Sequence, residues 1–361
     1  MELRIPGPTP LPDEVLKIMG RQMISHRGEE FQQILRGVIA DLKQLFQTQN
    51  DIFVLTGSGT GGLEAAIVNT LSPGDQVLSV SIGVFGERFA TIAEHFGAEV
   101  IPLHFEWGTA ADADAVRQAL RDRPQIKAVL LTHNETSTGV TNDLAHISSV
   151  VKELGTLLLV DAISSIGSIN LPMDEWLCDV IVTGSQKGWM APPGVAMVAV
   201  SPRAWQAHAE AKMPRFYWDF TRARSYLEKG QTPWTPSITP IFALSQSLTM
   251  MLAEGLPHIL ARHARISQAA RDGVKSLGLS LFADEKYASN TVTAVRVPDG
   301  LDIKRMLRIM REEHHIVLSG GQQKLDGQIF RIGHLGWVTE EDIKLVIAAL
   351  KVALPKAGYK Q

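Results

Sequence analysis

The chain has 361 residues, 45% of them hydrophobic and 20% charged, a composition typical of soluble globular proteins. Its formal net charge of −3 argues against nucleic acid or an anionic membrane as the main partner. The single cysteine, Cys178, excludes an internal disulfide framework. We expect neither a signal peptide nor a membrane span, because the first residues carry charges and no apolar run approaches the ~18 residues that a span needs. The chain is therefore expected to be cytoplasmic.

The N-terminal residues 1–14 are expected to form an arm. Prolines at positions 6, 8, 10 and 12 prevent a helix from starting before Pro12, whereas Asp13 and Glu14 suit the first turn of one. Since 361 residues exceed the usual size of a single core, we expect a large domain over residues 15–240 and a smaller α+β domain over residues 241–361.

Between residues 50 and 200, short apolar runs alternate with amphipathic stretches. This alternation predicts an α/β fold with a mostly parallel sheet covered by helices on both faces. Ligands of such sheets bind at the carboxyl ends of the strands. The expected strands are residues 52–56, 76–81, 99–103, 128–132, 157–161, 180–183 and 195–200, and the expected helices include 62–71, 86–96, 112–121 and 144–154.

The first of these strands leads into a glycine-rich turn, GSGTGG at residues 57–62, followed by a helical pattern. Glycines let backbone N–H groups approach an anion, and the helix N-terminus adds a favourable dipole, so this turn suits a phosphate monoester. The same glycines match the G-x-G-x-x-G pattern of dinucleotide sites. However, the next strand does not end in the acidic residue that the ribose requires, and Asp75 precedes that strand. A nicotinamide-dependent oxidoreductase is the alternative that this turn leaves open.

Residues 133–140, HNETSTGV, follow the strand that ends at residue 132. Their small hydroxyls and amide suit hydrogen bonds to a cofactor's phenolic oxygen or ring. His133 and Glu135 have no third ligand at a suitable spacing, so we expect no metal site.

Two later strands lead into residues of opposite charge. Asp161 ends the apolar run 157–161, and Lys187 follows the run 179–182. The carboxylate either caps a turn or keeps a pyridine nitrogen protonated. The lysine either lies in a surface loop or forms a Schiff base with a carbonyl cofactor. The two residues are 187 − 161 = 26 apart, which leaves room for one connection between neighbouring strands.

Residues 201–240 contain five prolines and are expected to be irregular. We expect their aromatic side chains to be buried near the active site; these are Phe216, Tyr217, Trp218, Phe220 and Trp234. A long helical pattern over 242–277 precedes expected strands near 291–297, 316–318 and 329–332, and expected helices near 303–313 and 340–354. Arg331 lies inside the last strand, where it forms either a structural ion pair or a fork for a substrate α-carboxylate.

Together these motifs resemble the class V, fold-type I aminotransferases that depend on pyridoxal phosphate, in the alanine/serine–glyoxylate aminotransferase branch. The resemblance covers essentially the whole chain. The matching segments are PGPTP at 6–10, GSGT at 57–60, HNETSTGV at 133–140, VD at 160–161, GSQK at 184–187, APPG at 191–194 and FRIG at 330–333.

The resemblance implies a role for each of ten residues. Lys187 binds pyridoxal phosphate as a Schiff base, and Asp161 pairs with the ring nitrogen. Ser58, Gly59, Thr60 and Gln186 hold the phosphate, Thr136 contacts the hydroxyl side of the ring, and Phe85 stacks on the ring where relatives often have tryptophan. Arg331 binds the substrate carboxylate. Thr235 completes the phosphate site of the partner subunit, which implies a homodimer with shared active sites, whereas Thr232 stands where some relatives have tyrosine.

The predicted function is transamination of a small amino acid, alanine or serine, with a 2-oxo acid such as glyoxylate or pyruvate. Another donor such as aspartate is the alternative. A desulfurase is excluded because no cysteine follows Lys187 and Gln186 stands in the place of the desulfurase histidine. A non-enzymatic relative would need an interaction module for which the chain has no spare segment. Four further residues are expected to face the cleft: His26, Arg27, Trp189 and His334.

Overall fold

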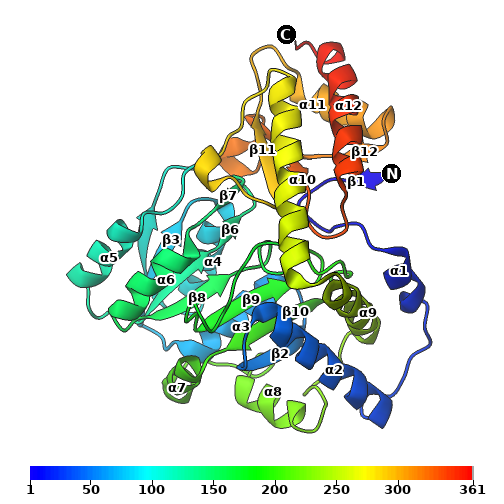
Figure 1. The fold of residues 1–361 in the computed structure, drawn as a ribbon. Coiled ribbons are helices and arrows are strands. Elements are labelled where there is room, and N and C mark those ends of the chain that lie inside the picture. Colours follow the sequence, from blue (N-terminus) through cyan, green and yellow to red (C-terminus); the bar gives the residue numbers. More distant parts are fainter. Residues whose placement is uncertain (360–361) are drawn as a thin grey trace.

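The computed structural model describes residues 1–359, so the last two residues of the expected small domain lie outside the described part. A seven-stranded sheet lies at the centre (Figure 1). In spatial order its strands are β2 (Asp51–Thr56), β10 (Val195–Val200), β9 (Val180–Gly184), β8 (Leu157–Asp161), β5 (Ala128–Thr132), β3 (Gln76–Ser81) and β4 (Glu99–His104). Only β10 runs antiparallel to its neighbours in this sheet. The predicted α/β class and all seven predicted strands are confirmed.

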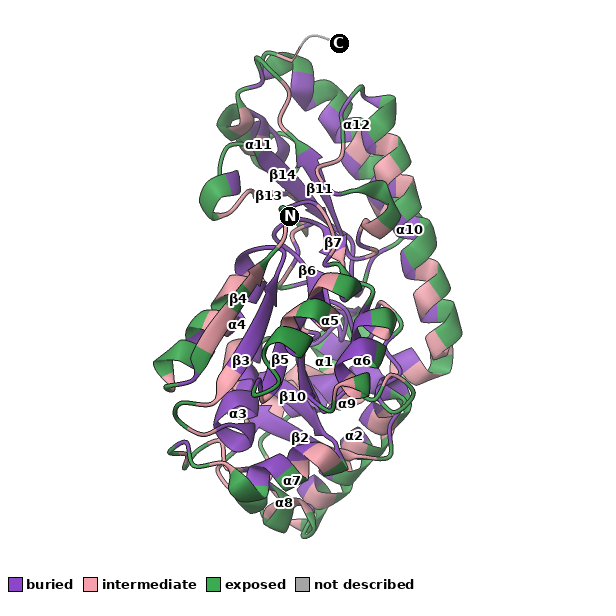
Figure 2. Cartoon of the chain, turned by 90° about the vertical axis from the view of Figure 1, so that its left-hand side faces the viewer, coloured by how far each residue is buried: buried purple, intermediate pink, exposed green. Residues whose placement is uncertain are grey.

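Helices cover both faces of the large sheet, so most of its strands are buried (Figure 2). Successive side chains of a strand point to opposite faces of the sheet. Phe53 and Leu55 of β2 pack into one apolar core, and Ile52 and Val54 into the other. The first core contains side chains of α3 (Gly59–Thr70), α4 (Val84–His95), α7 (Pro202–Glu210) and α8 (Phe220–Leu227). The second contains side chains of α1 (Asp13–Met19), α2 (Glu29–Phe46), α5 (Ala113–Asp122), α6 (Leu144–Glu153) and α9 (Ile238–Glu254).

The expectation that residues 201–240 are irregular is wrong, since α7 and α8 lie there. Ser201 caps α7 by accepting from the backbone N–H of Ala204, and Asp219 caps α8 by accepting from that of Arg222. The prolines do not prevent these helices because Pro202 occupies the first helical position, which tolerates proline.

The long helical pattern over 242–277 is two helices rather than one. Gly255, with φ of 83°, ends α9, and α10 (Leu256–Ser276) begins directly after it. Then follows a small sheet, which we define as the three strands β11 (Val292–Arg296), β14 (Ile329–Gly333) and β13 (Ser319–Gly320) in that order. Its core includes side chains of α10, α11 (Ile303–Glu312) and α12 (Glu340–Lys356), separate from the two cores of the large sheet. The predicted boundary at residue 240 remains a prediction.

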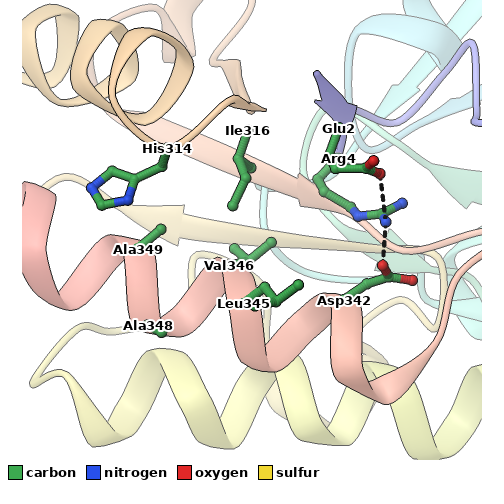
Figure 3. A pocket seen from close by; sticks show the side chains of 9 residues that line it. All are labelled: Glu2, Arg4, His314, Ile316, Asp342, Leu345, Val346, Ala348 and Ala349. Carbon is green, nitrogen blue, oxygen red and sulfur yellow. Dashed lines mark hydrogen bonds and ion pairs between the residues drawn. The ribbon is translucent and has the colours of Figure 1, made fainter.

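The N-terminal arm is fastened to the far end of the chain. Its strand β1 (Glu2–Leu3) pairs in parallel with β12 (Ile316–Val317), so the strand expected at 316–318 joins the arm rather than the small sheet. The buried Arg4 guanidinium lies 2.6 Å from a carboxylate oxygen of Asp342 on α12 and also pairs with Glu2 (Figure 3). The remaining elements are the hairpin strands β6 (Asn134–Glu135) and β7 (Val140–Thr141) and two 3-10 turns, η1 (Glu285–Tyr287) and η2 (Gln323–Leu325). Among the helices of residues 1–359, none has the length and apolar character to cross a membrane.

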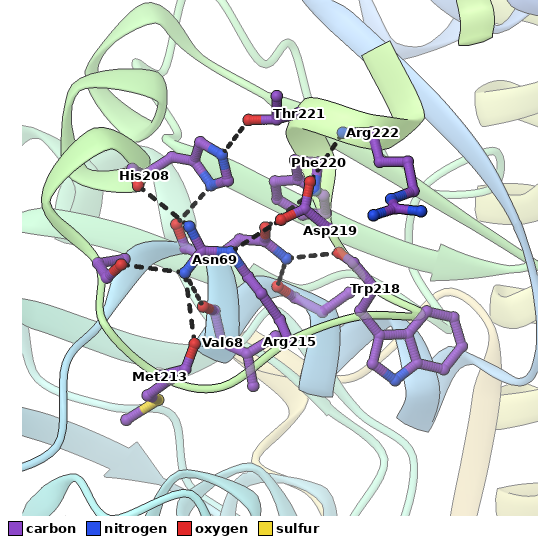
Figure 4. A network of polar contacts seen from close by, with 12 residues as sticks. Val68, Asn69, His208, Met213, Arg215, Trp218, Asp219, Phe220, Thr221 and Arg222 are labelled. Carbon is purple, nitrogen blue, oxygen red and sulfur yellow. Dashed lines mark hydrogen bonds and ion pairs between the residues drawn. The ribbon is translucent and has the colours of Figure 1, made fainter. Parts of the chain in front are cut away.

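A buried polar network holds the segment between α7 and α8 against the end of α3 (Figure 4). The Asn69 amide donates to the carbonyl of Trp218 at 2.7 Å and accepts from the backbone N–H of Phe220 at 3.0 Å. Arg215 donates to the carbonyls of Val68 and Ala211 at the ends of α3 and α7. This network positions the Trp218 ring, which lies over the glycine-rich turn.

We predict that Asn69→Ala lowers the free energy of unfolding by about 2–4 kcal/mol, because it leaves a buried carbonyl and a buried N–H without partners. Urea denaturation measures the change. Thr70→Val is the matched control: its hydroxyl is equally buried but only adds a second bond to a helix carbonyl, that of Ala66. Equal losses in the two variants would contradict the structural role of Asn69.

Candidate active site

A pocket opens at the carboxyl ends of the strands of the large sheet. Of the ten residues to which the resemblance assigns a role, all line it except Arg331 and Thr235. The lining residues are Ser58, Gly59, Thr60, Leu63, Phe85, Arg88, Asn134, Thr136, Asp161, Ile163, Ser164, Gln186 and Lys187. The parallel neighbours β8 and β9 bring Asp161 and Lys187 to the same edge, as their spacing indicates.

Lys187 is partly buried and carries no direct ion pair within residues 1–359. Its Nζ donates to the carbonyl of Pro6 in the N-terminal arm at 2.7 Å. Burial, together with the positive charges of Arg331 and Arg88, lowers the pKa of Lys187 to about 8, while Asp161 opposes the shift. A larger fraction of this amine is therefore neutral near pH 7 than of an ordinary lysine.

Asp161 is 3% exposed at the end of β8. Burial raises its pKa to about 7, and the nearby carboxylate of Glu135 acts in the same direction. A backbone hydrogen bond from Ile163 at 2.9 Å, together with the charges of Lys187 and Arg88, opposes this shift. The carboxylate therefore lies in a dry position where a cationic partner would favour its ionised form.

The N-terminus of α3 forms an open cradle beside these two residues. No side chain caps it, and within residues 1–359 the backbone N–H groups of Ser58, Gly59 and Thr60 have no hydrogen-bond partner. A Cβ on Gly59 would lie 2.5 Å from Cδ1 of Ile163, so a side chain there would displace Ile163. Free N–H groups at a helix N-terminus are an anion site.

The N-terminus of α4, across the pocket, is by contrast filled by the protein itself. Glu135 accepts hydrogen bonds from the backbone N–H groups of Phe85 and Gly86 at 3.0 and 3.1 Å, and Ser137 Oγ accepts from that of Val84. An anionic ligand therefore fits α3 and not α4. The sequence suggests only a metal-binding role for Glu135. No residue near Glu135 in the sequence indicates that it bonds to a helix fifty residues earlier in the chain.

Arg331 is 5% exposed and lies on β14, beside the pocket rather than in its lining. Its guanidinium donates to three uncharged oxygens: the carbonyls of Gly320 and Thr136, at 3.0 and 3.1 Å, and Oε1 of Gln322 at 3.2 Å. Burial lowers its pKa to about 10, against the opposing charge of Glu135. Because no carboxylate within residues 1–359 pairs with it directly, the interpretation as a structural ion pair is wrong, and the buried cation suits an anionic ligand.

Thr235 is exposed and lies outside the pocket of its own protomer. The side chain of Thr232 donates to the carbonyl of Trp234. Two aromatic side chains that we expected to be buried are not: Phe216 is 65% exposed and Tyr217 44%. Both stack on Trp234, so the three rings form a surface cluster beside Thr235.

None of the four residues expected to face the cleft lines this pocket: His26, Arg27, Trp189 and His334. Trp189 is fully buried against Phe46, and His334 is fully buried beside Thr293. Arg27 is exposed rather than buried and donates to the carbonyls of residues 232 and 233.

Three lining residues were not predicted: Arg88, Asn134 and Ser164. Arg88 lies one helical turn after Phe85, and its Cζ is 4.8 Å from the centre of that ring. The spacing of three residues on one helix is a signal that the sequence carried. Ser164 accepts hydrogen bonds from Thr136 Oγ1 and from the Asn134 amide, both at 2.8 Å.

Comparison with known proteins identifies the family. The family described as Aminotransferase class-V matches residues 4–344. The chain belongs to the class V aminotransferases. An L-aspartate–glyoxylate aminotransferase of Paracoccus denitrificans is 38% identical over 98% of this chain and 91% of its own length. The solved pyridoxamine–pyruvate aminotransferase of Mesorhizobium loti superposes with a TM-score of 0.95 at 32% identity, over 100% of this chain and 93% of that one. A relative named the small subunit of a soluble hydrogenase, from Synechococcus sp., is 45% identical over 99% of this chain and 94% of its length.

The chain is therefore a transaminase, and the predicted cofactor, pyridoxal phosphate, is that of its family. The class V assignment decides against the nicotinamide-dependent alternative. The residues present fit this cofactor: the α3 cradle matches a phosphate, Lys187 an aldehyde, and the dry carboxylate of Asp161 a protonated ring nitrogen.

We predict that in the cofactor-free class V protein, reductive alkylation of Lys187 by formaldehyde follows an apparent pKa near 8 instead of the ordinary value near 10.5. Only the neutral amine attacks the carbonyl, so lowering the pKa increases the rate at neutral pH. Mass spectrometry of the peptide that contains Lys187, across a pH series, measures this rate. The exposed Lys344 is the internal control, and identical pH profiles for the two lysines would contradict the prediction.

Proposed function

We propose that this enzyme transfers the amino group of a small amino acid, alanine or serine, to a 2-oxo acid such as glyoxylate or pyruvate. The observation that carries the proposal is Arg331, a buried guanidinium beside the pocket that is bound only to neutral oxygens. Such a group is suited to the α-carboxylate that every amino donor and 2-oxo acceptor shares. A relative named alanine–glyoxylate aminotransferase, from Nostoc sp., has a TM-score of 0.94 at 31% identity, which supports this substrate class.

The predicted site residues of the pocket then have defined tasks. Pyridoxal phosphate, when bound, accepts the electron pair that a substrate carbon releases on losing its proton. The free N–H groups at residues 58–60 and the Gln186 side chain would hold the phosphate, and the Phe85 ring would stack on the pyridine. The Asp161 carboxylate would keep the proton on the pyridine nitrogen. The Lys187 amine, with its lowered pKa, would take the proton from the substrate Cα.

Aspartate as donor is the alternative that one side chain supports. Arg88 lines the pocket, and no carboxylate within residues 1–359 forms an ion pair with it. A free guanidinium at this position favours a donor with a second carboxylate. The relative named for aspartate and glyoxylate agrees with this alternative.

We also propose that the enzyme is a homodimer in which Thr235 completes the phosphate site of the partner subunit. The exposed aromatic cluster of Phe216, Tyr217 and Trp234 supports the proposal, because large apolar side chains that gather on a surface are typical of a protein interface. Thr235 lies next to this cluster in the chain and is itself exposed.

The hydrogenase name of one relative receives no support from the residues of this chain. Its single cysteine, Cys178, is buried, and burial raises the pKa of the thiol to about 12. Within residues 1–359, no group of three or more histidine, cysteine or acidic side chains is arranged as a metal site.

We predict that Lys187→Ala lowers kcat by about 10³-fold or more, because the variant loses the amine that moves the proton. In the wild-type protein, borohydride reduction should fix the cofactor to the peptide that contains Lys187, and mass spectrometry should find no such adduct in the variant. The exposed Lys344→Ala serves as the control and should behave as wild type. Full turnover by Lys187→Ala would sink the assignment.

We predict that Arg331→Leu raises KM for every amino donor by about 10- to 100-fold, the value of one charge-assisted hydrogen bond. Initial rates with alanine, serine, aspartate and glutamate, each against glyoxylate, pyruvate and 2-oxoglutarate, measure the effect and rank the substrates. Arg88→Gln should raise KM selectively for aspartate if the acidic alternative holds. An unchanged donor KM in Arg331→Leu would refute the carboxylate role.

A further inference from the structure

Asn134 uses its whole hydrogen-bonding capacity to join two parts of the molecule. Its amide nitrogen donates to Ser164 Oγ at 2.8 Å and to Thr291 Oγ1 at 2.9 Å. Its amide oxygen accepts from Thr141 Oγ1 at 2.7 Å and from Ser289 Oγ at 2.6 Å. Two of these partners belong to the large sheet and its loops, and two directly precede β11 of the small sheet. All but the partly buried Thr141 are buried, so each bond is shielded from water.

The rest of the β6–β7 hairpin also contacts the segment that leads into β11 of the small sheet. Ser289 donates its backbone N–H to the carbonyl of Gly139 at 2.8 Å, and Val140 forms a bridge with Ala288. Gly139 has φ of +74°, and a Cβ there would lie 3.0 Å from Cβ of Ala294. The hairpin thus contacts β11 more closely than a side chain would permit.

This contact leads directly to Arg331. In the pairing of β11 with β14, Ala294 stands opposite Arg331, three residues after Thr291. The hairpin also reaches Arg331 from the other side, since the carbonyl of Thr136 accepts from its Nη1 at 3.1 Å. Asn134 itself lines the cofactor pocket. One short hairpin therefore contacts both the pocket wall and the strand pair that carries the guanidinium.

We propose that Asn134 is a positioning residue, which fixes the small sheet, and with it Arg331, at a set place relative to the cofactor pocket. The proposal rests on the carboxylate role of Arg331 in the proposed function. Asn134 acts on the substrate indirectly, through Thr291, β11 and the Arg331 guanidinium. Loss of the bridge lets the small sheet shift, which misplaces the guanidinium for the carboxylate while the phosphate cradle on α3 stays intact.

The test uses the loaded enzyme and three variants. Thr291→Val keeps the shape of the side chain and removes its bond to Asn134, Asn134→Ala removes the bridge, and the double variant completes a cycle. Propionate, which has the carbon skeleton of alanine without the amino group, is the binding probe, and isothermal titration calorimetry measures its dissociation constant. Ser267→Ala is the matched control, since this buried hydroxyl bonds Asn290, the residue between Ser289 and Thr291, without touching the hairpin.

We predict that Thr291→Val weakens propionate binding and raises donor KM by about fivefold or more, with kcat changed less than about twofold. The affinity for pyridoxal phosphate should stay unchanged in this variant. The double variant should bind propionate no more weakly than Asn134→Ala, because both substitutions break the same bridge. Ser267→Ala should bind propionate as wild type does.

Wild-type propionate affinity in Thr291→Val would overturn the proposal, and so would an equal loss in Ser267→Ala. Additive losses in the double variant would also count against a shared bridge. Arg331→Leu separates this proposal from the proposed function. If that variant binds propionate as wild type does, the carboxylate role itself fails, whereas weakened binding there with an unaffected Thr291→Val refutes only the bridge.

Discussion

The structure depends on three charged side chains that are held out of water without direct partners of opposite charge. Asp161 and Arg331 are buried and Lys187 is partly buried, and burial shifts the pKa of each toward its neutral form. Leaving such groups unpaired costs folding free energy. The fold retains this cost because the packing of the surrounding strands and glycine turns, and not the unpaired charges, determines the geometry of the site. Cofactor and substrate supply the missing partners when they bind, so binding offsets the free energy that the unpaired charges cost during folding.

Two helix N-termini face this pocket, and the protein treats them differently. At α4, Glu135 and Ser137 satisfy the backbone N–H groups, which fixes the Phe85 ring in place. At α3, no side chain does so. Both helix N-termini attract anions, but only that of α3 keeps free backbone N–H groups, so an anionic ligand binds at α3. The arrangement at α4 also places the Glu135 carboxyl, whose pKa is raised by burial, close enough to act on Asp161 and Arg331.

The parts of the site that lie at strand ends could be predicted from sequence. Asp161, Lys187 and the turn at residues 57–62 each follow an apolar run, and a parallel sheet brings such positions together. The parts that depend on tertiary contacts could not. Nothing near Glu135 indicates a bond to the start of α4, and nothing near Asn134 indicates Ser289 or Thr291. The expectation that Phe216 and Tyr217 are buried was wrong. The sequence shows that these side chains are apolar, but it does not show which surface of the same chain or of another covers them. The helices at 202–210 and 220–227 were not predicted, because the prolines of this segment argued against helices. In the structure none of these prolines lies in the interior of α7 or α8.

The N-terminal arm has a consequence for how the enzyme is made. Its first residues pair with β12, more than three hundred positions later, and the same arm supplies the Pro6 carbonyl that binds Lys187. The ribosome therefore makes the arm more than three hundred residues before its pairing strand. All strands of the large sheet are made by residue 200, whereas the arm gains its pairing partner only with β12. The sheet that carries Asp161 thus precedes the anchoring of the arm during synthesis, and the contact of Pro6 with Lys187 becomes fixed only after β12 is in place.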